Sequence, residues 1–339
     1  MMRPLHIVIT MPAQSKTSLR VDDSCLKMMH DAVPDAIITD ASDLVLKELE
    51  GNTAAGRELD ALLADTDILL GFAPPRDIVK RAPNLKWLQV TSAGVDRLAN
   101  FDIWNSEVII TGVSGIHATA ISEFVLSAML MLSKNSLHAF RNQSKRIWER
   151  YDTALLAGRT LGIVGLGHIG RETARLAKAF DMEVIATRRS ARQAGKARNV
   201  DRLLPQSDLI RLISMSDFVV LSVPLTRETH HLIGAEELAA MKSSAFLINI
   251  ARGPVIDEEA LIEALREGTI AGAALDVTDR EPLPPESPLW DLDNVILSPH
   301  VSGSMDDYML RATEVFCENL TRYRSGRKLV NIVNRARGY

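Results

Sequence analysis

The chain has 339 residues, 46% of them hydrophobic and 24% charged, with a formal net charge of −4. This is the composition of a globular protein of about two domains, and it excludes disordered and collagen-like classes. The slightly acidic balance lacks the excess of Lys and Arg that binds nucleic acid or anionic membranes, so we expect neither partner. Two cysteines, Cys25 and Cys317, are too few for a disulfide framework, and no apolar run reaches the length of a membrane span. We therefore expect a soluble, cytoplasmic protein.

Apolar runs of strand length alternate with helical patterns along almost the whole chain. This alternation is typical of parallel sheets with crossover helices, and runs that are apolar on both faces indicate sheets covered on both sides. We predict two doubly wound sheets of the α/β class, the first with strands at 5–10, 36–39, 67–71, 86–90 and 107–110, and the second with strands at 160–165, 182–187, 217–223, 245–250, 270–277 and 294–298.

Two helical segments stand out from this alternation. Residues 121–140 are apolar nearly all round, which predicts a helix buried on more than one side, either in a dimer interface or in the core of one chain. Near the end of the chain, apolar residues recur along one face of a helix that we expect to cross back and pack on the first domain. Its stripe consists of Met305, Met309, Ala312, Phe316, Leu320 and Tyr323.

A glycine motif follows the first strand of the second set. Gly165, Gly167 and Gly170 form G-x-G-x-x-G between a predicted strand and a predicted helix, the context in which the motif binds the pyrophosphate of a dinucleotide. The helix N-terminus adds free N–H donors and partial positive charge. His168 and Ile169 lie within the motif, and we expect them near the pyrophosphate, with His168 facing solvent rather than acting in catalysis.

The next strand ends in a cluster of arginines. An NAD enzyme usually has an acidic residue there, which bonds the ribose 2′-hydroxyl, but this chain has Thr187, Arg188, Arg189 and Ser190. Guanidinium groups bind phosphate through charge-assisted hydrogen bonds, so the sequence favours NADP(H), with NAD(H) still possible. The alternative is an exposed loop that merely fails to exclude a 2′-phosphate. Arg192 is expected to be plain surface.

Six ordered segments resemble the D-isomer-specific 2-hydroxyacid dehydrogenases. They are LKWLQVTSAGVDRL (85–98), TLGIVGLGHIG (160–170), VVLSVPLTRETHHLI (219–233), MKSSAFLINIARGPVID (241–257), ALDVTDREPLPPESPLW (274–290) and LSPHVSG (297–303). The resemblance implies a Rossmann dinucleotide-binding domain, residues 112–299, inserted in a flavodoxin-like substrate-binding domain, residues 1–111 and 300–339.

The resemblance also implies a catalytic set of Arg252, Glu281 and His300. Arg252 would bind the substrate carboxylate and polarise the neighbouring carbonyl, for which a planar guanidinium is well shaped. His300 would donate a proton to the oxygen that becomes negative on hydride transfer, and Glu281 would favour its protonated form. All three follow predicted strands, at the carboxyl edge where open α/β sheets bind ligands.

Further contacts are implied by the same resemblance. The segment Ser92, Ala93 and Gly94 would bind the substrate carboxylate, and Asp276 would bond the nicotinamide carboxamide. His117 is assigned a structural hydrogen bond in preference to a ligand contact, and packing in a dimer is preferred for Trp148 over a reach into the partner's site. The remaining predicted cofactor contacts are Thr119, Val223, Pro224 and Ala251.

Together these features predict NADPH-dependent reduction of a small 2-oxo acid, such as glyoxylate, hydroxypyruvate or an aliphatic 2-keto acid, to the D-2-hydroxy acid. We expect a homodimer formed through the dinucleotide-binding domain and no metal. Two alternatives remain: a dinucleotide-sensing protein like the corepressors that share this fold, and an NAD-preferring dehydrogenase that works in the oxidative direction.

Overall fold

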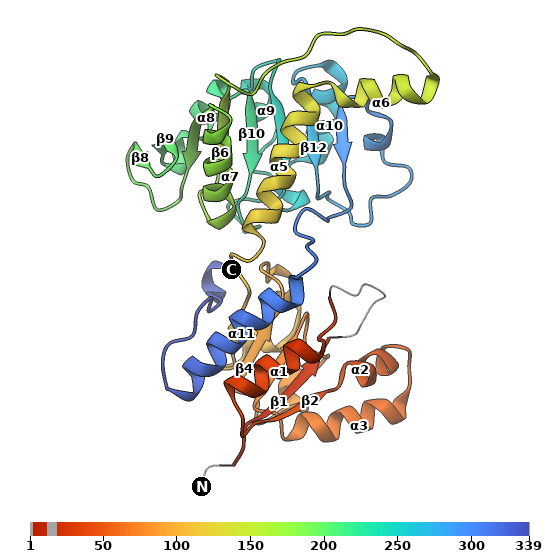
Figure 1. Ribbon diagram of the computed structural model, residues 1–339, viewed down its shortest axis with the longest axis vertical. Coiled ribbons are helices and arrows are strands. Elements are labelled where there is room, and N and C mark those ends of the chain that lie inside the picture. The colour runs from red at the N-terminus through yellow and green to blue at the C-terminus, as the bar shows by residue number, and fades with distance from the viewer. Residues whose placement is uncertain (1–2, 12–18, 339) are drawn as a thin grey trace. The chain divides into compact units, whose positions relative to one another are not determined.

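The computed structural model describes residues 3–11 and 19–338, and the chain forms two compact units (Figure 1). The split unit comprises residues 1–116 and 305–339, and the central unit comprises residues 117–304. The unit boundaries lie a few residues beyond those predicted from sequence. Gly112 and Val113 still bond within the split unit, to the carbonyl oxygens of Asn331 and Ser92, whereas Val301 and Ser302 still bond to Asp276 in the central unit.

The split unit is built on a parallel sheet of order β2-β1-β3-β4-β5, the flavodoxin-like order. Helices cover both faces because successive residues of a strand point to opposite sides. Ile7 and Ile9 of β1 pack with α1 and α11, whereas Val8 packs with α2, α3 and α4. The elements are β1 (His6–Thr10), α1 (Asp23–Ala32), β2 (Ile37–Asp40), α2 (Ser42–Leu49), α3 (Thr53–Ala64), β3 (Ile68–Gly71), α4 (Ile78–Arg81), β4 (Trp87–Val90), β5 (Ile109–Thr111) and α11 (Tyr308–Arg324).

The predicted return of the last helix to the first sheet is confirmed. Met309, Ala312, Phe316 and Leu320 of α11 are buried in the split unit, and the Phe316 ring lies 5.3 Å from that of Trp87 on β4. Met305 was wrongly placed in the helical stripe, because α11 begins three residues later, at Tyr308.

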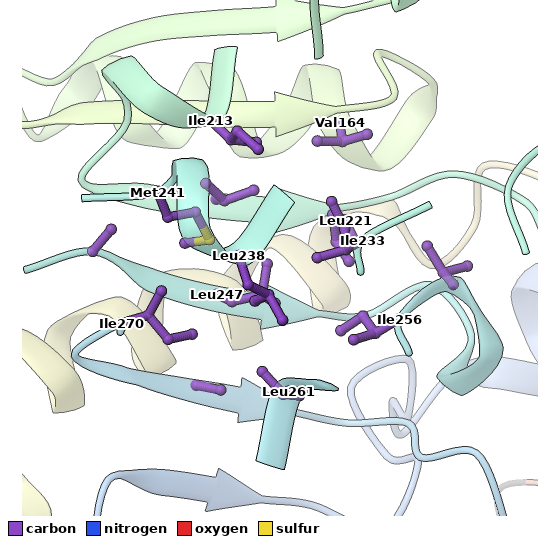
Figure 2. Close-up of a cluster of buried hydrophobic side chains, with 14 of the residues drawn as sticks. Val164, Ile213, Leu221, Ile233, Leu238, Met241, Leu247, Ile256, Leu261 and Ile270 are labelled. Carbon is purple, nitrogen blue, oxygen red and sulfur yellow. The ribbon is translucent and has the colours of Figure 1, made fainter. Parts of the chain in front are cut away.

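The central unit contains an eight-stranded sheet of order β13-β12-β11-β10-β6-β7-β9-β8, parallel except for β8. Helices α5 (Ala118–Ser133) and α7 cover one face, and α8, α9 and α10 cover the other (Figure 1). On this second face, Val164, Leu221, Leu247 and Leu261 belong to one apolar cluster (Figure 2). The strands are β6 (Thr160–Val164), β7 (Glu183–Thr187), β8 (Gly195–Ala197), β9 (Val200–Leu204), β10 (Phe218–Leu221), β11 (Phe246–Asn249), β12 (Gly272–Leu275) and β13 (Val295–Leu297). The helices are α7 (His168–Ala179), α8 (Leu209–Met215), α9 (Ala235–Ala240) and α10 (Glu258–Glu267).

The predicted α/β class and the two doubly wound sheets are confirmed, and every predicted strand is present. The hairpin β8–β9 was missed. Its strands lie at the sheet edge and alternate little between apolar and polar residues, and β9 exposes Asp201 and Arg202. The turn between them depends on Asn199, whose left-handed backbone (φ 60°) is a conformation that Asn tolerates better than most residues.

The single helix predicted at 121–140 is wrong: the segment forms α5 (Ala118–Ser133) and α6 (Ser136–Lys145). Asn135 between them has φ 50°, which ends the first helix. Helix α5 is buried against α7, with Ser122 Oγ 3.0 Å from Thr173 Oγ1, whereas α6 buries no residue in this chain. Within residues 3–11 and 19–338, no helix has both the length and the apolar character that crossing a membrane requires.

Candidate active site

The glycine turn after β6 has a shape that side chains would not allow. Gly165 has φ 102°, and a Cβ there would come 2.8 Å from the Ser222 carbonyl oxygen. A Cβ on Gly170 would come 2.3 Å from the carbonyl oxygen of Gly165, so this glycine lets α7 pack closely against the turn. Gly167 differs, because no atom lies within 4 Å of its notional Cβ. The turn therefore leaves open space over the N-terminus of α7, which fits a pyrophosphate group.

The first turn of α7 contains the other two residues of the motif. His168 is exposed and Ile169 is half-buried against the apolar cluster beneath α5. The N–H of Leu166 donates to the carbonyl oxygen of Thr187 at 3.1 Å, which joins the glycine turn to the end of β7. The arginine cluster begins at the next residue, Arg188, and therefore lies beside the glycine turn.

Arg188, Arg189 and Ser190 are all exposed in a tight turn. The N–H of Ala191 donates to the carbonyl oxygen of Arg188 at 2.9 Å, and the N–H of Arg188 donates to Leu204 on the missed strand β9 at 3.2 Å. A hydrogen bond from Thr226, together with the positive charges of Arg189 and Arg227, lowers the pKa of Glu228. Of the arginine cluster, Arg189 is therefore close enough to the loop after β10 for its charge to act on Glu228.

That loop contains the two predicted contacts Val223, which is half-buried, and Pro224, which is exposed. Thr229 Oγ1 donates to the Pro224 carbonyl oxygen at 2.6 Å and accepts from the Thr226 N–H at 2.8 Å, which gives the loop a fixed turn. Ser222 Oγ donates to the Gly165 carbonyl oxygen at 2.6 Å. The loop is thereby tied to the glycine turn.

Arg252 follows β11 in a turn organised by Asn249. The Asn249 side chain accepts from the N–H of Ala251 and donates to the carbonyl oxygen of Arg252, both at 3.0 Å. Gly253 lies directly against the chain after β12, because a Cβ there would come 2.0 Å from the Thr278 carbonyl group. Sequence reasoning missed Asn249 and Gly253, although both are in the NIARG segment that points to Arg252. Arg252 itself is half-buried, and Ala251 is buried.

Glu281 and His300 are brought together from the loops after β12 and β13. His300 Nδ1 lies 2.8 Å from Glu281 Oε2, and since a carboxylate accepts, Nδ1 is the donor. Nε2 is then the ring nitrogen able to give a proton to a substrate. The His300 side chain is 41% exposed, so it is open to a ligand.

Asp276 holds the loop on which His300 sits. The residue is 1% exposed, and its carboxylate accepts from Ser298 Oγ at 2.6 Å, from the Val301 N–H at 2.8 Å and from the Ser302 N–H at 3.1 Å. The backbone of His300 has φ 54°, and its N–H donates to the Asp276 carbonyl oxygen at 2.8 Å. These bonds stabilise an uncommon backbone conformation. The predicted contact of Asp276 with nicotinamide stays a prediction.

The other predicted residues lie as follows. Thr119 is exposed in the first turn of α5, and Trp148 is 96% exposed after α6. His117 is buried, and burial lowers its pKa to about 4, so the ring is neutral. Ser92, Ala93 and Gly94 follow β4 and belong to the split unit, where Ser92 Oγ donates to the Gly94 carbonyl oxygen at 2.8 Å. Their binding role stays a prediction.

A Rossmann sheet with this glycine turn is a dinucleotide-binding fold of the α/β class. Residues 126–302 match the family model described as "D-isomer specific 2-hydroxyacid dehydrogenase, NAD binding domain". The chain belongs to the D-isomer-specific 2-hydroxyacid dehydrogenase family and is an NAD(P)-dependent oxidoreductase.

Known relatives agree with this assignment. A glyoxylate reductase of Thermofilum pendens is 35% identical over 312 residues, which cover 88% of this chain and 91% of the relative. A D-isomer-specific 2-hydroxyacid dehydrogenase of Xanthobacter autotrophicus Py2, solved with NADPH and MES, has a TM-score of 0.81 and 29% identity, covering 99% of this chain and all of that one. An NADPH-dependent glyoxylate/hydroxypyruvate reductase of Sinorhizobium meliloti, solved with NADP and sulfate, has a TM-score of 0.80 and 26% identity over 99% of this chain and 100% of that chain.

Proposed function

We propose that this protein uses NADPH to reduce a small 2-oxo acid, such as glyoxylate, hydroxypyruvate or an aliphatic 2-keto acid, to the D-2-hydroxy acid. The observation that carries the proposal is the His300–Glu281 pair, whose side chains lie 2.8 Å apart. The pair is on loops at the carboxyl edge of the sheet that also carries the glycine turn. A histidine held by a carboxylate at the ligand edge of a nucleotide-binding sheet is suited to proton transfer beside a hydride acceptor.

A dinucleotide held over the glycine turn of Gly165, Gly167 and Gly170 would supply a hydride to the carbonyl carbon of the substrate. Arg252 binds the carboxylate of the 2-oxo acid and draws electron density from its carbonyl group. As the carbonyl oxygen becomes negative, His300 donates the Nε2 proton to it and becomes neutral. Glu281 stabilises the imidazolium before transfer and holds the ring through Nδ1. The product is a hydroxyl group at the former carbonyl carbon.

The preference for NADPH rests on the end of β7. Arg188, Arg189 and Ser190 are exposed there, and the sequence from Thr187 to Arg192 contains no carboxylate that would repel a 2′-phosphate. Two guanidinium groups on a turn beside the glycine motif can form charge-assisted bonds to that phosphate. The NADPH and NADP complexes of the Xanthobacter and Sinorhizobium proteins support this proposal.

Single-turnover oxidation of NADPH, measured across a panel of 2-oxo acids, tests the function. We expect at least one small acid to be reduced, NADH to be used less efficiently, and His300→Ala to bind NADPH normally while losing most of the rate. If no acid is reduced above background, or if His300→Ala turns over like the wild type, the proposal is wrong. More efficient use of NADH than of NADPH would instead favour an NAD-preferring dehydrogenase.

We further propose that the protein is a homodimer formed through an arm of the central unit, residues 136–155. The arm exposes several large apolar side chains that this chain leaves uncovered, and such patches are typical of interfaces. They are Phe140, Ile147, Trp148, Tyr151 and Leu155. Light scattering should give the mass of a dimer, and Trp148→Glu combined with Leu155→Glu should give a monomer. Leu49→Glu, which changes an exposed leucine of α2 in the split unit, is the control and should stay dimeric.

A further inference from the structure

The loop at 91–94 leaves the carboxyl edge of the split unit's sheet directly after β4. Its first residues bond to neighbouring segments: the Thr91 N–H donates to the Gly71 carbonyl oxygen at 3.0 Å, and the Ser92 carbonyl oxygen accepts from the Val113 N–H at 3.2 Å. These contacts attach the loop to the end of β3 and to the chain after β5.

A third attachment comes from a helix remote in sequence. Tyr308, the first residue of α11, donates its hydroxyl to the carbonyl oxygen of Thr91 at 2.7 Å, across 217 residues of sequence. The tyrosine ring packs on the apolar cluster of α1, α11 and the sheet. Burial raises the pKa of Tyr308 to about 12, so the hydroxyl remains a donor throughout the neutral range.

The Thr91 carbonyl and the Ser92 N–H belong to one peptide unit. Because that unit is planar and trans, the N–H points opposite to the C=O, and fixing the direction of one fixes the direction of the other. We propose that Tyr308 is a positioning residue, which orients the backbone of the 92–94 loop so that its N–H groups bind the substrate carboxylate. This inference rests on the proposed function, in which Ser92 to Gly94 bind that carboxylate.

The effect should be confined to substrate affinity. Backbone donors bind an anion well only when their directions are set in advance, so a loosened peptide unit weakens the carboxylate contact while leaving cofactor binding and proton transfer in place. Tyr308→Phe removes only the hydroxyl. We expect KM for the 2-oxo acid to rise about fivefold, equivalent to about 1 kcal/mol, with kcat and the Kd of NADPH within about twofold of the wild type.

Two measurements accompany the kinetics. The first is titration with oxamate, a carboxylate that is not reduced, whose Kd for the NADPH-loaded protein should rise by the same factor. The second is the thermal midpoint, which reports any general loosening. The control is Tyr323→Phe on the same helix. The Tyr323 ring stacks on that of Trp87, with ring centroids 5.6 Å apart, and the variant without its hydroxyl should keep wild-type KM and oxamate affinity.

The outcomes separate the two proposals. An active wild type with unchanged KM and oxamate affinity in Tyr308→Phe overturns the positioning role and leaves the proposed function standing. A rise in KM together with falls in kcat, NADPH affinity and thermal midpoint also overturns the positioning role, because such a combination marks a purely structural residue. A wild type that reduces no 2-oxo acid and binds no oxamate overturns the proposed function, and the role of Tyr308 with it.

Discussion

Glu281 Oε2 lies 2.8 Å from His300 Nδ1, although the two residues come from different loops of the central unit. The His300 loop is not held by this pair alone, because Asp276 accepts hydrogen bonds from Ser298, Val301 and Ser302, on both sides of His300. A proton donor held in this way keeps the orientation that proton transfer requires.

The first prediction concerns Glu281→Gln. Glu281 holds the His300 ring through Nδ1, and its negative charge stabilises the positive charge of the imidazolium. An amide in its place should lower kcat about a hundredfold, while the Kd of NADPH stays near that of the wild type. Steady-state kinetics and NADPH titration measure the two effects. Glu286→Gln alters an exposed carboxylate of the same Pro-rich loop and should keep the wild-type kcat. An equal loss of kcat in both variants would argue against the pair.

A second prediction addresses cofactor choice. Arg188→Asp places a negative charge where we propose that the 2′-phosphate binds, so KM for NADPH should rise at least about tenfold while KM for NADH changes little. Steady-state kinetics with both cofactors measure the ratio. Arg192→Asp makes the same charge change at an exposed arginine of the same segment and should leave the ratio near that of the wild type. Equal effects of the two variants would mean that Arg188 contributes only general surface charge.

Gly253→Ala tests the contact between the Arg252 turn and the chain after β12. The added methyl group would come 2.0 Å from the Thr278 carbonyl group and 2.4 Å from the Asp279 nitrogen, and backbone atoms have little freedom to move away. We expect a loss of about 3 kcal/mol or more in the free energy of unfolding, measured by urea denaturation, together with loss of activity. Gly195→Ala, where no atom lies within 4 Å of the notional Cβ, should change stability little. Normal stability of Gly253→Ala would contradict the contact.

His117 should make stability depend on pH. Burial lowers its pKa from 6.5 to about 4, so the unfolded chain binds a proton more readily than the folded protein between those values. The contribution of neutral His117 is therefore fully present above about pH 6.5 and falls as pH drops towards 4, by about 3 kcal/mol in all. Urea midpoints of His117→Gln should lose less on acidification than those of the wild type. His30→Gln, at an exposed histidine, should keep the wild-type acid sensitivity.

The sequence predicted the structure correctly where the pattern lies within a short stretch of the chain. Apolar runs such as 217–223 identify buried strands because every residue of such a strand faces a covered side of the sheet. The glycine motif is readable because its residue types recur at a fixed spacing, although only Gly170 has a steric reason within the motif, the carbonyl oxygen of Gly165. Gly165 itself lies against Ser222, which is remote in sequence. The last two strands of the sheet, β9 and the edge strand β8, carry a weaker pattern, since most of their residues are exposed or half-buried. Asn135 interrupts a helix without interrupting its apolar pattern.

By itself, then, the sequence determined the α/β class, the strands of both sheets, the dinucleotide motif and the family, since these depend on short-range pattern and on residue types at fixed spacing. Only the tertiary structure decided that Glu281 and His300 meet, that Asp276 holds the His300 loop, that Gly253 lies against Thr278, and that Tyr308 reaches Thr91. Each of these contacts joins residues from different strands or helices, and chain folding, rather than sequence spacing, sets the distance between such residues.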